Sequence, residues 1–373
     1  MKVVQIQDFH EKNGNITEFA GFNLPLWFKG IIPEAMAVRN AAGIFDVSHM
    51  GRVVIKGKDS AKLLDNVTTN DVPSLKIGQG QYSLICNPEG GIKDDVTVFR
   101  LGEHEHLVVY NAGNRSKDYD WIVSNASGLE VSISDVSDDV AMFAVQGPKA
   151  RRIVGSLSKN NLDTIPRFGW AWTELAHAKT LVTQTGYTGE DGFEVYVWDS
   201  SISNPSKARS VWDRLLEVGK PYGLEPCGLG ARDLLRLEAG LCLYGTDMDE
   251  NTNPYEAKLS FVVKLHKEFI GKQRLQAIKE KGTPRVRVGL LTVKRVIPRR
   301  GFGIAGEGKP IGTVSSGTLS PLLNTGIAMG YVQRESAQEG RFVDIQVRER
   351  IEKAKIVKTP FYDTTRYGYS RKG

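Results

Sequence analysis

The clearest pattern of apolar and polar positions along the chain lies between residues 82 and 99. Two stretches rich in β-forming side chains, 82–86 and 92–99, are separated by a turn-forming Asn-Pro-Glu-Gly-Gly sequence. The second stretch contains two adjacent acids, Asp94 and Asp95, although aspartate is disfavoured in strands. The pattern predicts a β-hairpin with a pair of carboxylates on its second strand.

Successive strand residues face opposite ways, so the two acids are expected to point apart. Asp94 falls on the face of Val96, whereas Asp95 falls on the face of Thr97 and Phe99. Acids on opposite faces do not easily share a proton or a metal ion. An unpaired carboxylate on a half-buried strand costs free energy unless it is hydrogen-bonded or solvated. The alternation leaves two interpretations open, a functional acid or two acids that border an exposed strand.

Helical and strand-like periodicities recur along the rest of the chain. Helical patterns occupy residues 34–42, 59–64, 117–123, 148–157, 206–219 and 231–239. Strand patterns occupy residues 44–50, 53–55, 106–110, 140–143, 180–184 and 193–198. Their order predicts an α+β fold with two similar halves of the split β-α-β kind, rather than a parallel dinucleotide-binding sheet. Beyond residue 283, strands separated by glycine-rich turns predict a small β-barrel or sandwich.

Length and composition indicate a globular protein of two or three domains, because 373 residues exceed the usual size of a single core. No apolar run approaches the length of a membrane span, so we expect no membrane partner. The first residues lack the apolar segment of a signal peptide. Three widely spaced cysteines fit a reducing compartment, and together these features predict a cytoplasmic location.

The net charge of +6 is spread unevenly, because residues 284–373 hold 17 Lys and Arg against 7 Asp and Glu. Such a basic module attracts anionic partners, nucleic acid among them. No helix-turn-helix, RNA-binding aromatic signature or Arg-rich block accompanies the charge, and an acidic protein or a polyanionic small molecule fits as well. The six histidines show no metal-binding spacing, so we expect no metal site.

Two further segments carry candidate chemistry. Residues 185–194 contain three glycines, which allow a ligand to approach the backbone closely, and three acids; a plain surface turn is the alternative. Because a strand follows, Glu194 is a carboxylate that enters a sheet, as Asp95 does. On the helix predicted at 231–239, Arg232 and Arg236 share one face, as they would on an exposed, salt-bridged helix.

Several long motifs, in order along nearly the whole chain, resemble those of the aminomethyltransferase (T-protein) family of the glycine cleavage system. They include Gly-Ile-Phe-Asp-Val-Ser-His-Met-Gly at 43–51, Gly-Gly-Ile-Lys-Asp-Asp at 90–95, Gln-Gly-Pro at 146–148, the segment 185–194, Gly-Leu-Gly-Ala-Arg-Asp at 228–233 and Thr-Val-Ser-Ser-Gly-Thr-Leu-Ser-Pro at 313–321. The resemblance implies a three-lobed cloverleaf around a central folate cavity. We expect residues 1–51 and 138–275 in a first α+β lobe, 52–137 in a second that holds the catalytic hairpin, and 276–373 in a basic β-barrel.

The resemblance implies an enzyme that transfers the methylene of a lipoyl-bound aminomethyl group to tetrahydrofolate. The products would be 5,10-methylenetetrahydrofolate, ammonia and the dihydrolipoyl carrier. The implied partners are a lipoylated H-protein and tetrahydrofolate as co-substrate, without a metal. Position-by-position matching assigns the catalytic role to Asp95, which as an ordinary aspartate would be ionised near pH 7.

The same matching assigns the folate-binding residues. The pterin-binding carboxylate falls on Glu194, because a carboxylate accepts the paired N–H groups of a pterin edge, and a folate-binding arginine falls on Arg232. Further wall residues implied by the resemblance or by the face of Asp95 are Met50, Tyr82, Asn111, Tyr187, Thr97, Phe99 and Phe261. A C-terminal tyrosine that approaches folate in some relatives falls at Arg366 or Tyr367.

Two alternatives come from the same superfamily. A folate-dependent demethylase of a methylated sulfur or nitrogen compound usually diverges at the Val-Ser-His-Met and Asp-Asp positions, and both fit the aminomethyltransferase here. Non-catalytic folate-binding factors linked to RNA modification and iron–sulfur repair carry a Lys-Gly-Cys-Tyr-type motif. The corresponding residues 263–271 contain no cysteine.

Overall fold

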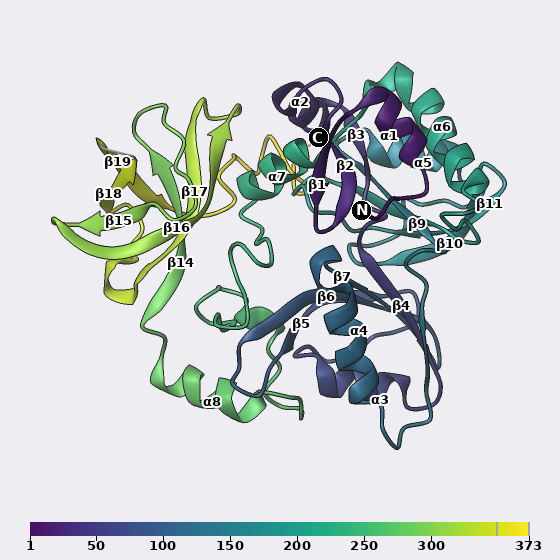
Figure 1. Cartoon of the computed structure of the whole chain (residues 1–373), viewed down its shortest axis with the longest axis horizontal. Helices are drawn as coiled ribbons and strands as arrows, with labels where there is room; N and C mark the ends of the chain where they lie inside the picture. The colour runs from purple at the N-terminus through teal and green to yellow at the C-terminus, as the bar shows by residue number, and fades with distance from the viewer. Residues whose placement is uncertain (348–349, 372–373) are drawn as a thin grey trace.

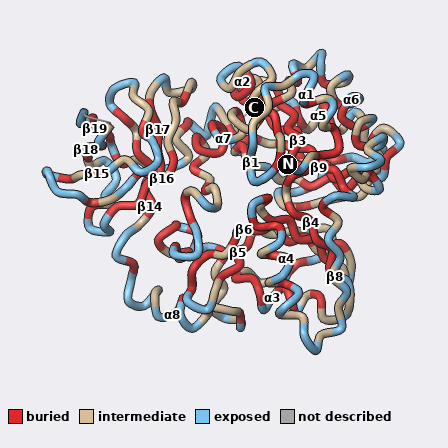
Figure 2. The backbone as a smooth tube through the Cα atoms, viewed as in Figure 1, coloured by how far each residue is buried: buried red, intermediate tan, exposed pale blue. Residues whose placement is uncertain are grey.

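The computed structural model describes residues 1–347 and 350–371. They form three lobes (Figure 1): two lobes built on β-sheets with helices, and a third that is a closed six-stranded barrel. Buried residues follow the strands of the two sheets and of the barrel, whereas exposed residues gather in the outer loops (Figure 2). The predicted α+β class with a C-terminal barrel is confirmed.

The first lobe is built on a six-stranded sheet with the order β10-β11-β12-β9-β3-β13. Its strands are β3 (Ala42–Asp46), β9 (Ala141–Gln146), β10 (Trp170–Leu175), β11 (Ala178–Thr183), β12 (Gly192–Val197) and β13 (Leu224–Pro226). Its helices are α1 (Gln7–Asn13), α2 (Ile31–Asn40), α5 (Ala150–Leu157), α6 (Ser206–Gly219) and α7 (Leu229–Glu238). A hairpin of β1 (Asn15–Phe19) and β2 (Phe22–Trp27) precedes α2. Helix α6 buries residues at helical spacing, among them Val211, Trp212 and Leu215, and Trp212 packs on Phe143 of β9.

The second lobe is built on a five-stranded antiparallel sheet with the order β5-β6-β7-β4-β8. Its strands are β4 (Gly51–Lys56), β5 (Gly80–Cys86), β6 (Ile92–Gly102), β7 (Glu105–Tyr110) and β8 (Ser132–Asp135), with helices α3 (Ser60–Val67) and α4 (Arg115–Ser124). The predicted hairpin is β5 and β6. Buried and half-buried residues alternate along β6 from Ile92 to Val98, so Asp94 is buried and Asp95 lies on the other face, as predicted.

The two sheets have the same connectivity. The succession β4-α3-β5-β6-β7 in the second lobe corresponds to β9-α5-β10-β11-β12 in the first, and the strand orders agree. One apolar cluster joins Val54, Leu107 and Phe99 of the second sheet to Leu181 and Tyr196 of the first. The two similar halves predicted from the sequence therefore pack sheet against sheet.

The barrel consists of β14 (Arg285–Thr292), β15 (Gly303–Gly306), β16 (Lys309–Ser320), β17 (Thr325–Gln333), β18 (Phe342–Val347) and β19 (Arg350–Val357). After β19 the chain leaves the barrel and returns to the first lobe, as the yellow segment in Figure 1 shows. There Arg371 and the buried Arg39 of α2 both form ion pairs with Glu190. This C-terminal tail, residues 358–371, therefore ties the barrel side of the molecule to the first lobe.

The segment after α7 packs on a different lobe from the one that the predicted domain boundary assigns it to. Cys242, Leu259, Phe269 and Leu275 form one apolar cluster with residues of the β5–β6 hairpin, and α8 (Lys272–Lys281) follows. The sequence analysis placed residues up to 275 in the first lobe. The residues of this segment instead pack on the second lobe, because their apolar side chains cover the turn end of its hairpin, at Leu84, Cys86 and Ile92.

Within residues 1–347 and 350–371, no helix is both long enough and apolar enough to span a bilayer. The three cysteines are free and buried. The cytoplasmic location expected from the sequence stays a prediction.

Candidate functional site

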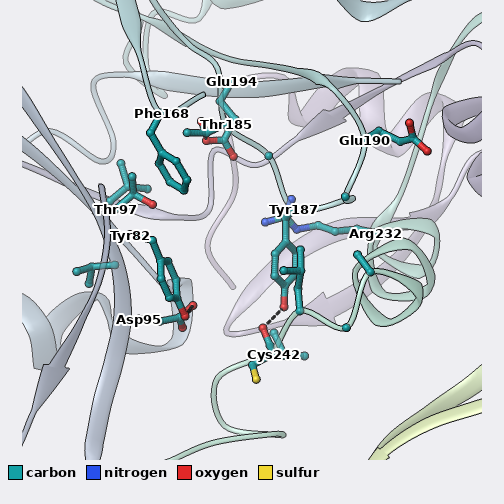
Figure 3. Close-up of a pocket in the computed structure, with 18 of the residues that line it drawn as sticks. Tyr82, Asp95, Thr97, Phe168, Thr185, Tyr187, Glu190, Glu194, Arg232 and Cys242 are labelled. Carbon is teal, nitrogen blue, oxygen red and sulfur yellow. Dashed lines mark hydrogen bonds between the residues drawn. The ribbon is translucent and has the colours of Figure 1, made fainter. Parts of the chain in front are cut away.

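A cavity of about 1190 Å³ lies where the lobes meet. It exceeds the usual range for small-molecule sites, about 300–1000 Å³. Its lining comes from both sheets, from the loop 184–192, from residues 239–262 and from the C-terminal tail. Figure 3 shows Tyr82, Asp95 and Thr97 on one side of this cavity and Tyr187 and Arg232 on another. The space is sufficient for a large ligand together with part of a second one.

Asp95 reaches the cavity from β6 and is held by two donors. The hydroxyl of Tyr82 donates to Asp95 Oδ2 at 3.0 Å, because the two side chains are neighbours across the β5–β6 pair. The Asn111 amide, which follows β7, donates to Asp95 Oδ1 at 2.8 Å. The same amide donates to Asp94 Oδ1 at 2.8 Å, and the Asn111 backbone N–H donates to Asp94 Oδ2 at 3.0 Å. Asn111 therefore bridges the two acids, although they belong to opposite faces.

The protonation of Asp95 differs from the expectation of an ordinary aspartate. Burial, followed by the charge of Asp94, raises the pKa of Asp95 to about 7, while the hydrogen bonds from Tyr82 and Asn111 act in the opposite direction. The sequence predicts that the two acids lie on opposite faces of the strand. It does not reveal how far each carboxyl is buried from water, and burial is the main cause of the raised pKa. At neutral pH this carboxyl is poised to gain or lose a proton.

Glu194 reaches the cavity from β12, on the side of the first lobe. Its carboxylate accepts a hydrogen bond from the Thr185 hydroxyl. Burial raises the pKa of Glu194, and Thr185 and the charge of Arg232 offset part of that effect. The three glycines of residues 185–194, at positions 186, 189 and 192, all line the cavity. Gly186 and Gly192 also serve internal packing, because a Cβ there would overlap the Gln146 amide or the Val145 carbonyl.

Arg232 lies on α7 with its guanidinium 4.7 Å from the centre of the Tyr187 ring. Tyr187 itself donates a hydrogen bond to the Cys242 carbonyl, drawn as a dashed line in Figure 3. Within the part of the chain that the structure describes, no ion pair of Arg232 with an acid occurs. Its helix neighbour Arg236 is buried and paired with Asp247 instead, so α7 is not the exposed, salt-bridged helix considered above.

Most of the other predicted wall residues are brought together, with one exception. Met50, Tyr82, Thr97, Asn111, Tyr187 and Phe261 all line the cavity. Phe261 stacks on Tyr82 and keeps 64% of its surface exposed. Phe99 is not among the lining residues: it is fully buried in the cluster between the two sheets and contacts Tyr196. The prediction that Phe99 borders the ligand is wrong, because the strand face that carries Asp95 is covered by the first lobe at that point.

Several lining residues escaped the sequence analysis. Phe168 and Thr185 lie above Tyr82 and Asp95 in Figure 3, and the Cys242 carbonyl accepts the hydrogen bond from the Tyr187 hydroxyl. Phe168 adopts a positive φ of 61° and its carbonyl accepts a hydrogen bond from Gly80, so it joins the two lobes. An apolar residue in an irregular loop carries no periodic signal. Thr185 belongs to residues 185–194, which the sequence analysis considered as a candidate segment. Its contact with Glu194 was not predicted, because the two residues are nine positions apart.

The C-terminal tail supplies another wall. Tyr362 and Tyr367 line the cavity, whereas Arg366 is exposed and does not. Tyr362 lies under the buried Arg39, with the guanidinium 4.6 Å from the ring centre. Of the two positions considered for an aromatic contact with folate, the structure thus places Tyr367 at the cavity.

The residues present suit a folate-like ligand. A carboxylate at Glu194, a guanidinium at Arg232 and the flat side chains of Tyr82, Tyr187 and Phe168 face one space. Such a set offers acceptors for N–H donors, a positive charge for an anionic group and apolar surface for aromatic rings. Among the described residues, no three His, Cys, Asp or Glu side chains gather in a metal-binding arrangement.

Comparisons with known proteins agree over nearly the whole chain. Residues 6–267 match the GCVT N-terminal domain, and residues 285–363 match the glycine cleavage T-protein C-terminal barrel domain. The chain is 43% identical to a probable aminomethyltransferase of Pyrococcus horikoshii, covering 100% of this chain and 99% of that protein. It is 42% identical to the aminomethyltransferase of Bacillus subtilis over 95% of this chain and 97% of that one. The crystal structure of the glycine cleavage aminomethyltransferase T from Bartonella henselae superposes with a TM-score of 0.90 at 33% identity, covering 98% of this chain and 99% of that one. The chain belongs to the aminomethyltransferase (T-protein) family of the glycine cleavage system.

Proposed function

We propose that this enzyme transfers the methylene of a lipoyl-bound aminomethyl group to tetrahydrofolate, with Asp95 as the catalytic carboxyl. The observation that carries the proposal is the position of Asp95: it lies in the wall of the large cavity, held by Tyr82 and Asn111, with its pKa raised to about 7. Relatives named aminomethyltransferase, similar over nearly the full length, support the same reaction.

The chemistry moves one carbon and two protons. The methylene leaves the lipoyl sulfur and ammonia departs from it, while both bridging folate nitrogens bond to the carbon. The two protons that these nitrogens lose end on ammonia and on the lipoyl thiol. Asp95 accepts a proton from an attacking nitrogen, and as a carboxylate it stabilises the cationic iminium character of the transferred group. A pKa near 7 suits proton exchange at neutral pH.

Glu194 and Arg232 hold the co-substrate in this proposal. The Glu194 carboxylate accepts the paired N–H groups of the pterin edge, and Thr185 fixes its orientation. Arg232 contributes a guanidinium without an acidic partner among the described residues. These groups bind the folate on the first lobe, which leaves the two nitrogens that become bridged facing the second lobe and Asp95.

Replacement of Asp95 by Asn tests the catalytic assignment. Asn keeps the shape and the contact with Tyr82 but cannot accept the proton, so the transfer rate should fall about 100-fold or more. The dissociation constant for tetrahydrofolate, measured by calorimetry, should change by less than about threefold, because Glu194 and Arg232 still bind the folate. A rate close to that of the unaltered enzyme would contradict the proposal.

The lipoylated H-protein is the proposed carrier of the aminomethyl group. H-proteins are generally acidic, and the loop after β14 exposes Lys294, Arg295, Arg299 and Arg300. We propose that this basic barrel surface steers the carrier toward the cavity. The second-order transfer rate should fall as salt rises, and Arg295→Glu with Arg299→Glu should lower it about tenfold at low salt. Lys12→Glu on α1, away from the barrel (Figure 1), is the matched control. If neither salt nor the double substitution changes the transfer rate, the barrel surface does not steer the carrier.

A further inference from the structure

A third acid lies behind the pair of Asp94 and Asp95. Asp118 stands in the first turn of α4, which covers the face of the second sheet opposite the cavity. Its side chain is fully buried. Within the part of the chain that the structure describes, no amide or hydroxyl donor reaches either of its oxygens. An ionised carboxylate in such a place would lack the hydrogen bonds that usually compensate its charge.

Neighbouring cations compensate such a charge only in part: Lys117 and Lys93 lower the pKa of Asp118, but less than burial and Asp94 raise it. The Lys117 ammonium donates to the Lys93 carbonyl at 2.6 Å, to the Tyr244 hydroxyl at 3.0 Å and to Glu250 at 3.3 Å. Lys93 turns to Glu250 at 3.6 Å. Both lysine ammonium groups therefore form their ion pairs with Glu250 rather than with Asp118. The polar group against Asp118 is the carboxylate of Asp94, which is fully buried as well.

Two buried carboxylates in contact cannot both be ionised without a large energetic cost, so the pair holds a proton. Asp94 already accepts hydrogen bonds from the Asn111 backbone and amide N–H groups. Asp118 accepts none from the described residues. The proton is therefore more stable on Asp118. Burial, followed by the charge of Asp94, raises the pKa of Asp118 well above its ordinary value, in agreement with this geometry.

We propose that Asp118 is a neutral carboxylic acid that donates a hydrogen bond to Asp94 and thereby positions the chain Asp94–Asn111–Asp95 in the site. The consequence for Asp95 is electrostatic. Asp94 keeps its negative charge, and that charge is one of the causes that raise the pKa of Asp95. Asp118 is thus a positioning residue: it touches neither substrate nor cavity and acts through Asp94 and Asn111. Its kinetic consequence rests on the catalytic role proposed for Asp95.

Infrared spectroscopy tests the protonation without relying on activity. In the Asp95→Asn background, in which Asp95 contributes no acid, a protonated-carboxyl stretching band should persist at about pH 8.5, where ordinary aspartates are ionised. Adding Asp118→Asn should remove the band. Asp120→Asn, on an exposed position of the same helix, should leave it unchanged. The absence of a band that depends on Asp118 would overturn the proposal even if Asp95 is catalytic.

Kinetics of single variants test the positioning role. Asp118→Asn keeps a neutral donor to Asp94, so kcat should stay within about threefold and the acidic limb of the pH profile should not move. Asp118→Leu removes the donor, and kcat should fall about tenfold with the KM for tetrahydrofolate unchanged. If Asp118 were ionised, Asp118→Asn would remove a negative charge and shift the limb to lower pH, which would overturn the proposal. Because Asp118→Asn is nearly isosteric, this test holds even if Asp118→Leu fails to fold.

Discussion

The two sheets share one connectivity, yet they place different acids at the cavity. Asp95 lies on β6, whose counterpart in the first lobe is β11, whereas Glu194 lies on β12, the counterpart of β7. The acids therefore do not occupy equivalent positions of a repeated unit. Each lobe carries its carboxylate on a different strand of the shared topology. This agrees with the general rule that the fold positions the elements and individual side chains determine the function.

The charged groups next to the two acids have opposite signs. Asp95 neighbours the negative charge of Asp94, whereas Glu194 neighbours the positive charge of Arg232. Burial raises the pKa of both, but the second acid adds to this effect at Asp95 and the guanidinium opposes it at Glu194. One lobe thus holds a carboxyl suited to proton exchange, and the other holds a carboxylate suited to accepting fixed hydrogen bonds.

The largest expected effect that separates the two acids is on folate affinity. Glu194→Ala removes the acceptor of two pterin N–H groups, and its affinity for tetrahydrofolate should fall about 100-fold, since hydrogen bonds to a charged group contribute roughly 1.5–3 kcal/mol each. Glu194→Gln keeps one acceptor oxygen and should lose less. Calorimetric titration measures both. An unchanged affinity in Glu194→Ala would show that the two acids do not divide binding and chemistry in this way.

A smaller effect, on the rate and its pH dependence, is expected when Asn111, which bridges Asp94 and Asp95, is replaced. Asn111 stabilises the ionised form of Asp95, so Asn111→Leu should raise the pKa of Asp95 further and move the acidic limb of the rate profile to higher pH. The rate at neutral pH should fall about tenfold, as expected for a lost hydrogen bond to a charged group. Tyr82→Phe removes the other donor and should shift the limb in the same direction. Shifts of opposite sign in the two variants would contradict the assignment of that limb to Asp95.

The sequence sufficed for those parts of the molecule that have a periodic signal. Helix α6 matches the predicted range 206–219, and strand alternation correctly separated Asp94 from Asp95. The short strands β8 and β10 and the hairpin of β1 and β2 were missed, since brief strands without a regular alternation of buried and exposed residues carry little periodicity.

The site depended on contacts between residues far apart in the chain. Asn111 joins acids that lie 16 and 17 positions away, and Tyr362 packs under Arg39 of the first lobe. Resemblance to a family supplied the names of most wall residues, but Phe99, which was also expected from the strand face of Asp95, does not line the cavity. That side chain turns into the contact between the two sheets, and no pattern within one strand reveals what covers its face.

A further predicted difference between the two acids concerns stability as a function of pH. The pKa of Asp95 is about 7 in the folded protein and about 4 in an unfolded chain, so the folded state binds the extra proton between these values. Stability linked to Asp95 is therefore present at low pH and is lost as the pH rises toward 7. Asp95→Asn removes this loss. Relative to the unaltered enzyme, its free energy of unfolding should increase by up to about 3 kcal/mol between about pH 4.5 and about pH 8. Glu194→Gln should show the same sign with a smaller change, because Arg232 and Thr185 offset part of the burial at that site. Urea unfolding at both pH values measures the differences. Equal changes in the two variants would mean that the neighbouring charge does not distinguish the acids. A larger change in Asp95→Asn would agree with the opposite charges beside them, Asp94 next to Asp95 and Arg232 next to Glu194.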